Sequence, residues 1–203
     1  MANLDFFLEF ASPYTYLAAM RVGTLAQAAG VAVRWRPFLL GPIFKAQGWN
    51  DSLFNIYPAK GRYALRDLER TSAALGLPFR KPDPFPQSGL LAARVALVGL
   101  GEDWGEAFCR NVFAAEFGEG RQIAEPTVIT DILCGLAVAP EPVLARAQSD
   151  AIKAKLRTES EHAQRLGIFG APTFVTADGE LFWGNDRMEQ ALKWARGRAE
   201  SSG

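Results

Sequence analysis

Apolar and polar positions alternate at the start of the chain and then change to a helical spacing. The alternation from Leu4 to Phe10 predicts a strand at about 3–10, and its apolar residues on both faces are typical of a central strand. A helical pattern begins at Ser12 and ends at Gly30, and a β-rich run at 31–38 follows directly. Strand, helix and strand in this order predict a βαβ unit with a right-handed crossover.

The middle of the chain, from about 45 to 165, has a different pattern. Apolar residues recur there at helical spacing, and prolines and glycines separate the runs. Helices are predicted near 88–100 and 103–117, another after Pro126, and two more between Pro142 and Gly167. Because no strand pattern of similar strength occurs in this region, we expect a helical subdomain.

Short apolar runs of the β type return near the end of the chain. The runs at 173–177 and 180–183 flank the pair Asp178-Gly179, a combination that favours a β-hairpin. A final helix is predicted at about 186–197.

Taken in order, these elements are βαβ, a long run of helices, and ββα. Two parallel strands, a hairpin and flanking helices predict an α/β fold with a thioredoxin-like sheet. We therefore expect a thioredoxin-like domain formed by residues 1–45 and 166–203, interrupted by an inserted helical domain at 46–165.

Composition narrows the class of protein without changing this picture. The chain has 203 residues, 49% hydrophobic and 22% charged, which suits one globular domain with or without an insertion. Its 22 basic and 22 acidic residues cancel, so no overall field attracts nucleic acid or an anionic membrane. We expect a small-molecule partner rather than either of these.

Targeting and metal-binding features are not apparent either. The first residues lack a basic n-region, and no apolar run approaches the ~18 residues of a membrane helix, so we expect a cytoplasmic protein. Cys109 and Cys134 form no CxxC motif, and the chain has a single histidine. Two reduced thiols and no metal site are the expectation.

Candidate chemistry lies where strands end and helices begin. Ser12 stands at the start of the first helix with Pro13 after it, Ala171-Pro172 precedes the hairpin, and Asp186 opens the last helix. Each has an ordinary structural explanation: Ser12 as an N-cap, Pro172 as a loop proline whose peptide bond can be cis, and Asp186 as a complement to the helix dipole. Together they place a hydroxyl, a peptide edge and a carboxylate on neighbouring ends of one sheet, which suits a γ-glutamyl-cysteinyl ligand.

Five ordered motifs carry a family resemblance along nearly the whole chain. They are FFLEFASPYTYLA, WRPFLLGPIFKAQG, PAKGRYALRDLER, GIFGAPTFV and LFWGNDRME. On these motifs the chain resembles the 2-hydroxychromene-2-carboxylate isomerases and the similar kappa-class glutathione transferases, within the DsbA-like thioredoxin superfamily. The resemblance implies a thioredoxin domain interrupted by a helical domain, glutathione as cofactor, and a homodimer.

The resemblance also implies a reaction. It is the glutathione-dependent isomerisation of 2-hydroxychromene-2-carboxylate, or a related intermediate of aromatic compound degradation such as naphthalene catabolism, to trans-o-hydroxybenzylidenepyruvate. In the family, the hydroxyl at the position of Ser12 donates a hydrogen bond to the glutathione sulfur and favours the thiolate. An alternative is a transferase or peroxidase that uses the same thiolate on electrophiles.

Other site residues follow from the matching positions. The implied glutathione contacts are Ser12, Pro13, Tyr14, Ala171, Pro172, Asn185 and Asp186. Lys60 and Asn50 match positions near the glycine carboxylate or the substrate, and Asn50 and Asn55 compete for one role because the alignment there is loose. Phe44 and Trp49 are candidate walls for an aromatic substrate.

One departure from the superfamily limits the chemistry. Its thiol oxidoreductases carry CxxC where this chain has Ser12-Pro13-Tyr14-Thr15, so dithiol exchange is excluded at that site. A third hypothesis remains open, namely a non-catalytic thioredoxin-like module that binds peptides at the Pro172 edge.

Overall fold

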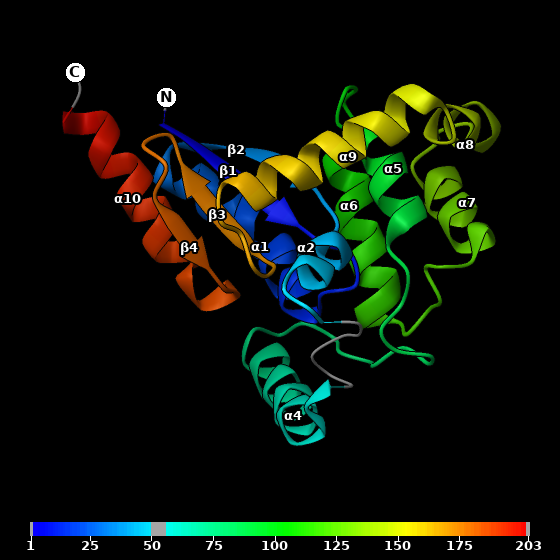
Figure 1. Ribbon diagram of the computed structural model, residues 1–203, viewed down its shortest axis with the longest axis horizontal. Coiled ribbons are helices and arrows are strands. Elements are labelled where there is room, and N and C mark those ends of the chain that lie inside the picture. Colours follow the sequence, from blue (N-terminus) through cyan, green and yellow to red (C-terminus); the bar gives the residue numbers. More distant parts are fainter. Residues whose placement is uncertain (1, 50–55, 202–203) are drawn as a thin grey trace.

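A computed structural model describes residues 2–49 and 56–201 and contains a four-stranded mixed sheet (Figure 1). The strands are β1 (Ala2–Leu8), β2 (Val31–Pro37), β3 (Thr173–Thr176) and β4 (Leu181–Trp183), in the order β2-β1-β3-β4. β1 pairs parallel with β2 and antiparallel with β3, which pairs antiparallel with β4. The predicted central strand, parallel pair and hairpin are confirmed.

Aromatic side chains on β1 fix both faces of the sheet. Phe6 pairs with Trp35 on β2 and Phe174 on β3, and its ring stacks on that of Phe174 with centroids 5.1 Å apart. Phe7 points to the opposite face, where its ring contacts Phe38 edge-on at 5.9 Å. Both rings are fully buried, which explains why β1 is apolar on both sides.

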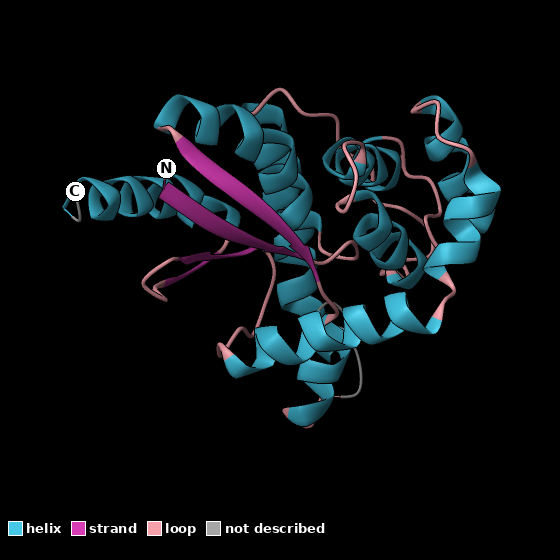
Figure 2. Ribbon diagram, turned by 90° about the horizontal axis from the view of Figure 1, so that it is seen from above, coloured by secondary structure: helices cyan, strands magenta, loops and turns pink. Residues whose placement is uncertain are grey.

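Helices cover the two faces of the sheet (Figure 2). On the face of Phe6 lie α1 (Pro13–Ala29) and α10 (Met188–Ser201), the latter preceded by the 3₁₀ turn η2 (Asn185–Arg187). On the face of Phe7 lie α9 (Asp150–Arg165) and the short helix α2 (Leu40–Ala46). The α2 helix was not predicted, because its seven residues include a glycine and a proline and show no clear period.

Three of the remaining helices pack around α5 (Leu90–Gly99), namely α6 (Gly105–Phe113), α7 (Pro126–Gly135) and α8 (Pro140–Ala147). The helix α4 (Pro58–Ala74) contacts α1 instead. The helix predicted at 103–117 divides into α6 and a π-helical turn, η1 (Ala114–Gly118). α5 is buried on nearly all sides, whereas α4 projects from the body (Figure 1). Where the two predicted domains begin and end stays a prediction.

None of the helices in the described part of the chain is long and apolar enough to cross a membrane.

Candidate functional site

Ser12 is the residue where α1 begins. Its backbone is extended, with φ −97° and ψ 112°, and its Oγ accepts a hydrogen bond from the Thr15 N–H at 3.4 Å while Pro13 occupies the first turn. The predicted N-cap is therefore confirmed. The same hydroxyl donates to the carbonyl oxygen of Ala171 at 2.9 Å, which ties the start of α1 to the loop before β3.

The loop that meets Ser12 is held in a defined shape. The Ala171–Pro172 peptide is cis, and the Pro172 carbonyl accepts from the N–H of Gly184 at 2.9 Å. Gly170 packs against the Trp183 indole so closely that an added Cβ would lie 2.4 Å from its Nε1, so no other residue fits there without movement. The backbone edge of Ala171 therefore faces Ser12.

A cavity of about 1020 Å³ opens beside these two residues. Its walls come from the turn before α1, from α2, from the first turns of α4, from the segment 86–90 and from the loop 169–171. Small-molecule sites typically measure about 300–1,000 Å³. The cavity therefore has room for a tripeptide and an aromatic acid together.

Most of the predicted site residues meet in this cavity. Those that line it are Ser12, Pro13, Tyr14, Phe44, Trp49, Lys60 and Ala171.

Three others lie beside the cavity rather than in its wall. Pro172 is buried under the loop, and the Asn185 Oδ1 accepts from the Arg21 Nη1 at 3.3 Å. Asp186 has 71% of its side chain exposed and forms an ion pair with Arg187 at 3.0 Å.

Asn50 and Asn55 lie outside the described residues.

Aromatic rings and cations give the cavity a mixed character. Phe44 and Trp49 lie with ring centroids 5.5 Å apart, and on another wall Phe169 and Trp183 lie 4.9 Å apart. The Lys60 ammonium stands 4.9 Å from the centre of the Tyr57 ring, and Lys45 is a second cation on the wall. Such a surface suits an anionic ligand with an aromatic or conjugated body.

Tyr14 connects the site to the projecting helix α4. Its hydroxyl donates to the Asp67 Oδ2 at 2.9 Å. Burial and this carboxylate raise the pKa of Tyr14 above its ordinary value, so the phenol stays protonated at neutral pH. The hydroxyl is a structural donor between α1 and α4.

Glu9 is a cavity residue that the sequence analysis missed. Its carboxylate accepts from the backbone N–H of Leu40 at 2.9 Å and of Ala11 at 3.4 Å. The residue is only 6% exposed, and its burial raises its pKa to about 7. The one available sign was an acid directly after a buried strand and before a buried phenylalanine, in LEF.

Glu116 lies behind Glu9, on η1. It is 0% exposed, and neither carboxyl oxygen has a hydrogen-bond partner among the residues the structure describes. Burial raises its pKa well above the ordinary value, and the charge on Glu9 raises it further. The π-helical turn that carries Glu116 is a type of irregularity found often near functional sites.

Comparison with known proteins agrees with this geometry. Residues 3–193 match the DSBA-like thioredoxin domain. The chain is 28% identical to a 2-hydroxychromene-2-carboxylate isomerase of Sphingobium xenophagum, over 92% of this chain and 94% of that protein. It is 26% identical to the glutathione S-transferase kappa 1 of Rattus norvegicus, over 92% of this chain and 87% of that protein.

A solved structure agrees as well. That of a 2-hydroxychromene-2-carboxylate isomerase superposes with a TM-score of 0.84 at 26% identity, covering 97% of this chain and 95% of the other. The resemblance drawn from the five motifs is confirmed, and the chain belongs to the family of DSBA-like thioredoxin domains.

Proposed function

We propose that this protein is a glutathione-dependent isomerase of 2-hydroxychromene-2-carboxylate or a related aromatic-degradation intermediate, with trans-o-hydroxybenzylidenepyruvate as product. The observation that carries the proposal is the meeting of the Ser12 hydroxyl, the Ala171 backbone and the start of α1 in one cavity. The similarity to isomerases of that name over nearly the full length supports the choice of reaction.

Ser12 fits the task of holding a thiolate. Its Oγ already accepts from Thr15, so its proton is the group it offers, and a modest rotation redirects that proton from Ala171 to a sulfur in the cavity. The positive end of the α1 helix dipole adds positive potential at the same point. Both interactions favour an anion over a neutral thiol.

Glutathione held beside Ser12 and the Ala171 backbone would supply a nucleophilic thiolate for reversible addition to the substrate. The chain supplies the binding surfaces. The Ala171 backbone suits the cysteinyl peptide, and Lys45 and Lys60 suit carboxylates of the ligand or substrate. Phe44 and Trp49 form an apolar wall for the aromatic ring.

Two further contacts belong to the same proposal. Asp186, an exposed carboxylate on the 3₁₀ turn that follows β4, is the proposed partner of the γ-glutamyl ammonium. Asn185 acts indirectly, by holding Arg21 through its side-chain oxygen. The homodimer, the cytoplasmic location and any role of Asn50 or Asn55 remain predictions.

A glutathione transferase or peroxidase is the second candidate. The observation that favours it is the similarity to kappa-class transferases at nearly the same identity and coverage. In that case the same thiolate attacks an electrophile and stays attached to it.

The test follows the absorbance of a hydroxychromene carboxylate with protein and glutathione. We expect isomerisation with no loss of glutathione, and a Ser12→Ala variant with kcat/KM lower by about 10–100-fold, the value of a hydrogen bond to a charged group. Ser149→Ala is the matched control, because Ser149 caps α9 with the same 3.4 Å bond to a backbone N–H.

Three outcomes would overturn parts of the proposal. Stoichiometric consumption of glutathione would replace the isomerase with the transferase. Unchanged turnover in Ser12→Ala would remove Ser12 from the mechanism. Failure of the wild-type protein to bind glutathione would leave only the peptide-binding hypothesis.

A further inference from the structure

We propose that Glu9 takes up the proton that the glutathione thiol loses when it ionises in the cavity. The inference rests on the proposed function, because it concerns the same ligand at the same site. Glu9 is then the group of the protein that accepts this proton, a role that Ser12 cannot have.

Ser12 is unsuited to accept the proton because its hydroxyl is already committed. One lone pair of its Oγ receives the Thr15 N–H, and the hydroxyl proton is the donor that a thiolate needs. A thiol that becomes a thiolate beside Ser12 therefore has to release its proton to another group or to water.

Glu9 stands one tight turn before Ser12. The Ser12 N–H donates to the Glu9 carbonyl oxygen at 3.1 Å, and the N–H of Ala11, the residue between Phe10 and Ser12, donates to the Glu9 carboxylate at 3.4 Å. Glu9, Ala11 and Ser12 all line the cavity. The Glu9 carboxylate and the Ser12 hydroxyl thus belong to the two ends of one turn in the cavity wall.

The surroundings of Glu9 leave its charge poorly compensated. Its hydrogen bonds come from backbone N–H groups, and among residues 2–49 and 56–197 no cation pairs with it. Gly89 closes over it, so tightly that an added Cβ would lie 3.0 Å from the Glu9 Oε1. With a pKa of about 7, Glu9 exists in both protonation states near neutral pH, as a proton acceptor requires.

The charges in the cavity also favour the transfer. When the thiol S–H bond breaks and the proton bonds to a Glu9 oxygen, one negative charge moves from the carboxylate to the sulfur, and the net charge stays the same. Without the transfer, an ionised Glu9 and a thiolate would face each other in a desolvated site, and like charges disfavour that state. Ser12 and the start of α1 then stabilise the charge in its new position.

Other titratable groups around the cavity are accounted for. Burial and the Asp67 carboxylate raise the pKa of Tyr14 on α1, and Glu116 on η1 is not part of the cavity wall. The other titratable residues of the wall are Lys45 on α2, Tyr57 directly before α4 and Lys60 on α4, and the segment 86–90 contributes none.

The test counts the protons released when glutathione binds. Binding heats are measured at about pH 8 in buffers of different ionisation enthalpy, where most Glu9 is ionised and most free glutathione is still a thiol. For the wild-type protein we expect close to zero protons released per glutathione bound. For Glu9→Gln, which has no acceptor, we expect release close to one or a bound thiol without thiolate absorbance.

Glu116→Gln is the matched control. It makes the same chemical change at a neighbouring buried acid that does not line the cavity, and we expect it to keep the wild-type proton count. Equal proton release and equal thiolate absorbance in wild type and Glu9→Gln would overturn the inference while leaving glutathione binding intact. Absence of any binding heat in the wild type would instead overturn the proposed function.

A second measurement uses only the wild-type protein, so it can be made even if the Glu9→Gln protein does not fold. Infrared difference spectra of the wild-type protein at about pH 8 should gain the C=O stretch of one protonated carboxyl group when glutathione is added. A spectrum that shows no new protonated carboxyl at saturating glutathione would contradict the proposal.

Discussion

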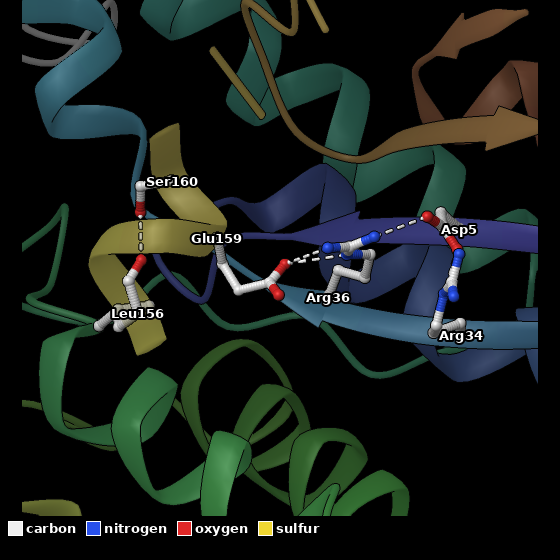
Figure 3. Close-up of polar contacts among 6 residues, drawn as sticks. All are labelled: Asp5, Arg34, Arg36, Leu156, Glu159 and Ser160. Atoms are coloured by element: carbon white, nitrogen blue, oxygen red, sulfur yellow. Dashed lines mark hydrogen bonds and ion pairs between the residues drawn. The ribbon is translucent and has the colours of Figure 1, made fainter. Parts of the chain in front are cut away.

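Two acids near the sheet differ sharply in how their charges are compensated. Asp5, on β1, accepts from the Arg34 Nε at 2.6 Å and from the Arg36 Nη1 at 2.9 Å (Figure 3). Arg36 in turn pairs with Glu159 on α9 at 2.8 Å. Glu9, four residues after Asp5, has backbone N–H groups instead of a cation.

The paired Asp5 has a structural role, whereas Glu9 is placed where it can take part in chemistry. The row of charges Asp5–Arg36–Glu159 joins β1, β2 and α9, and none of its three residues lines the cavity beside Ser12. Glu9 lies in the wall of the cavity, where a ligand can compensate its charge or take its place. Buried charges that hold a fold are paired, whereas an unpaired buried acid in a cavity is a candidate for proton transfer.

The largest expected effect is at the centre of the paired row. Arg36→Met leaves Asp5 and Glu159 without their shared cation, while only 12% and 18% of these side chains are exposed. We expect the free energy of unfolding to fall by about 2–3 kcal/mol, less than for a fully buried pair. Urea unfolding at neutral pH measures it. Arg34→Met, at a side chain 69% exposed, should cost under about 1 kcal/mol, and equal losses would contradict the comparison.

Replacing a buried acid that has no partner should stabilise the fold instead of destabilising it. Glu116→Met replaces a buried acid that lacks a partner with an apolar side chain, and we expect the free energy of unfolding at about pH 8 to rise by about 1–3 kcal/mol. Urea midpoints compare the two proteins. A loss of stability at this pH would show that Glu116 has a partner.

The unpaired Glu9 should also make the free energy of unfolding depend on pH. For Glu9, the pKa rises on folding from 4.5 to about 7, so the folded protein binds more protons between these values. Its contribution to stability is complete below about pH 4.5 and is lost by about pH 7. Glu9→Gln should remove this downward slope in unfolding free energy measured from pH 4.5 to 8, and an unchanged slope would contradict the raised pKa.

The smallest effect is expected at the hydrogen bond between α1 and α4. Tyr14→Phe removes the donor to Asp67, and we expect the free energy of unfolding to fall by about 1 kcal/mol, with faster amide exchange in α4. Tyr63→Phe, at an exposed tyrosine on the same helix, is the control. Equal exchange rates in both variants would show that Tyr14 does not hold α4.

The sequence predicted those parts of the site that depend on local chemistry. Ser12 before Pro13 is an N-cap in sequence and in structure, and Asp178-Gly179 forms the turn it predicts, with Gly179 at φ 86°. The central position of β1 followed from its apolar alternation, and the hairpin from the two short apolar runs beside this turn. These features depend on neighbours within a few residues.

What the sequence could not predict depends on distant contacts. Glu9 occupies a polar position in an alternating strand, and only the packing of Gly89 and α2 encloses it. Glu116 lies in a helical pattern, and nothing local indicates that its face is buried beside Glu9. Asn185 similarly turns toward Arg21, which precedes it by 164 residues.

The proposed role of Ser12 is to hold glutathione as a thiolate. The ultraviolet absorbance of the thiolate tests this role most directly when glutathione is added at about pH 7, where free glutathione is almost entirely a thiol. We expect a thiolate band in the wild-type protein and in Ser149→Ala, and a band that is lost or strongly reduced in Ser12→Ala. A band of equal size in Ser12→Ala, or glutathione that binds the wild-type protein without any band, would contradict the proposed role.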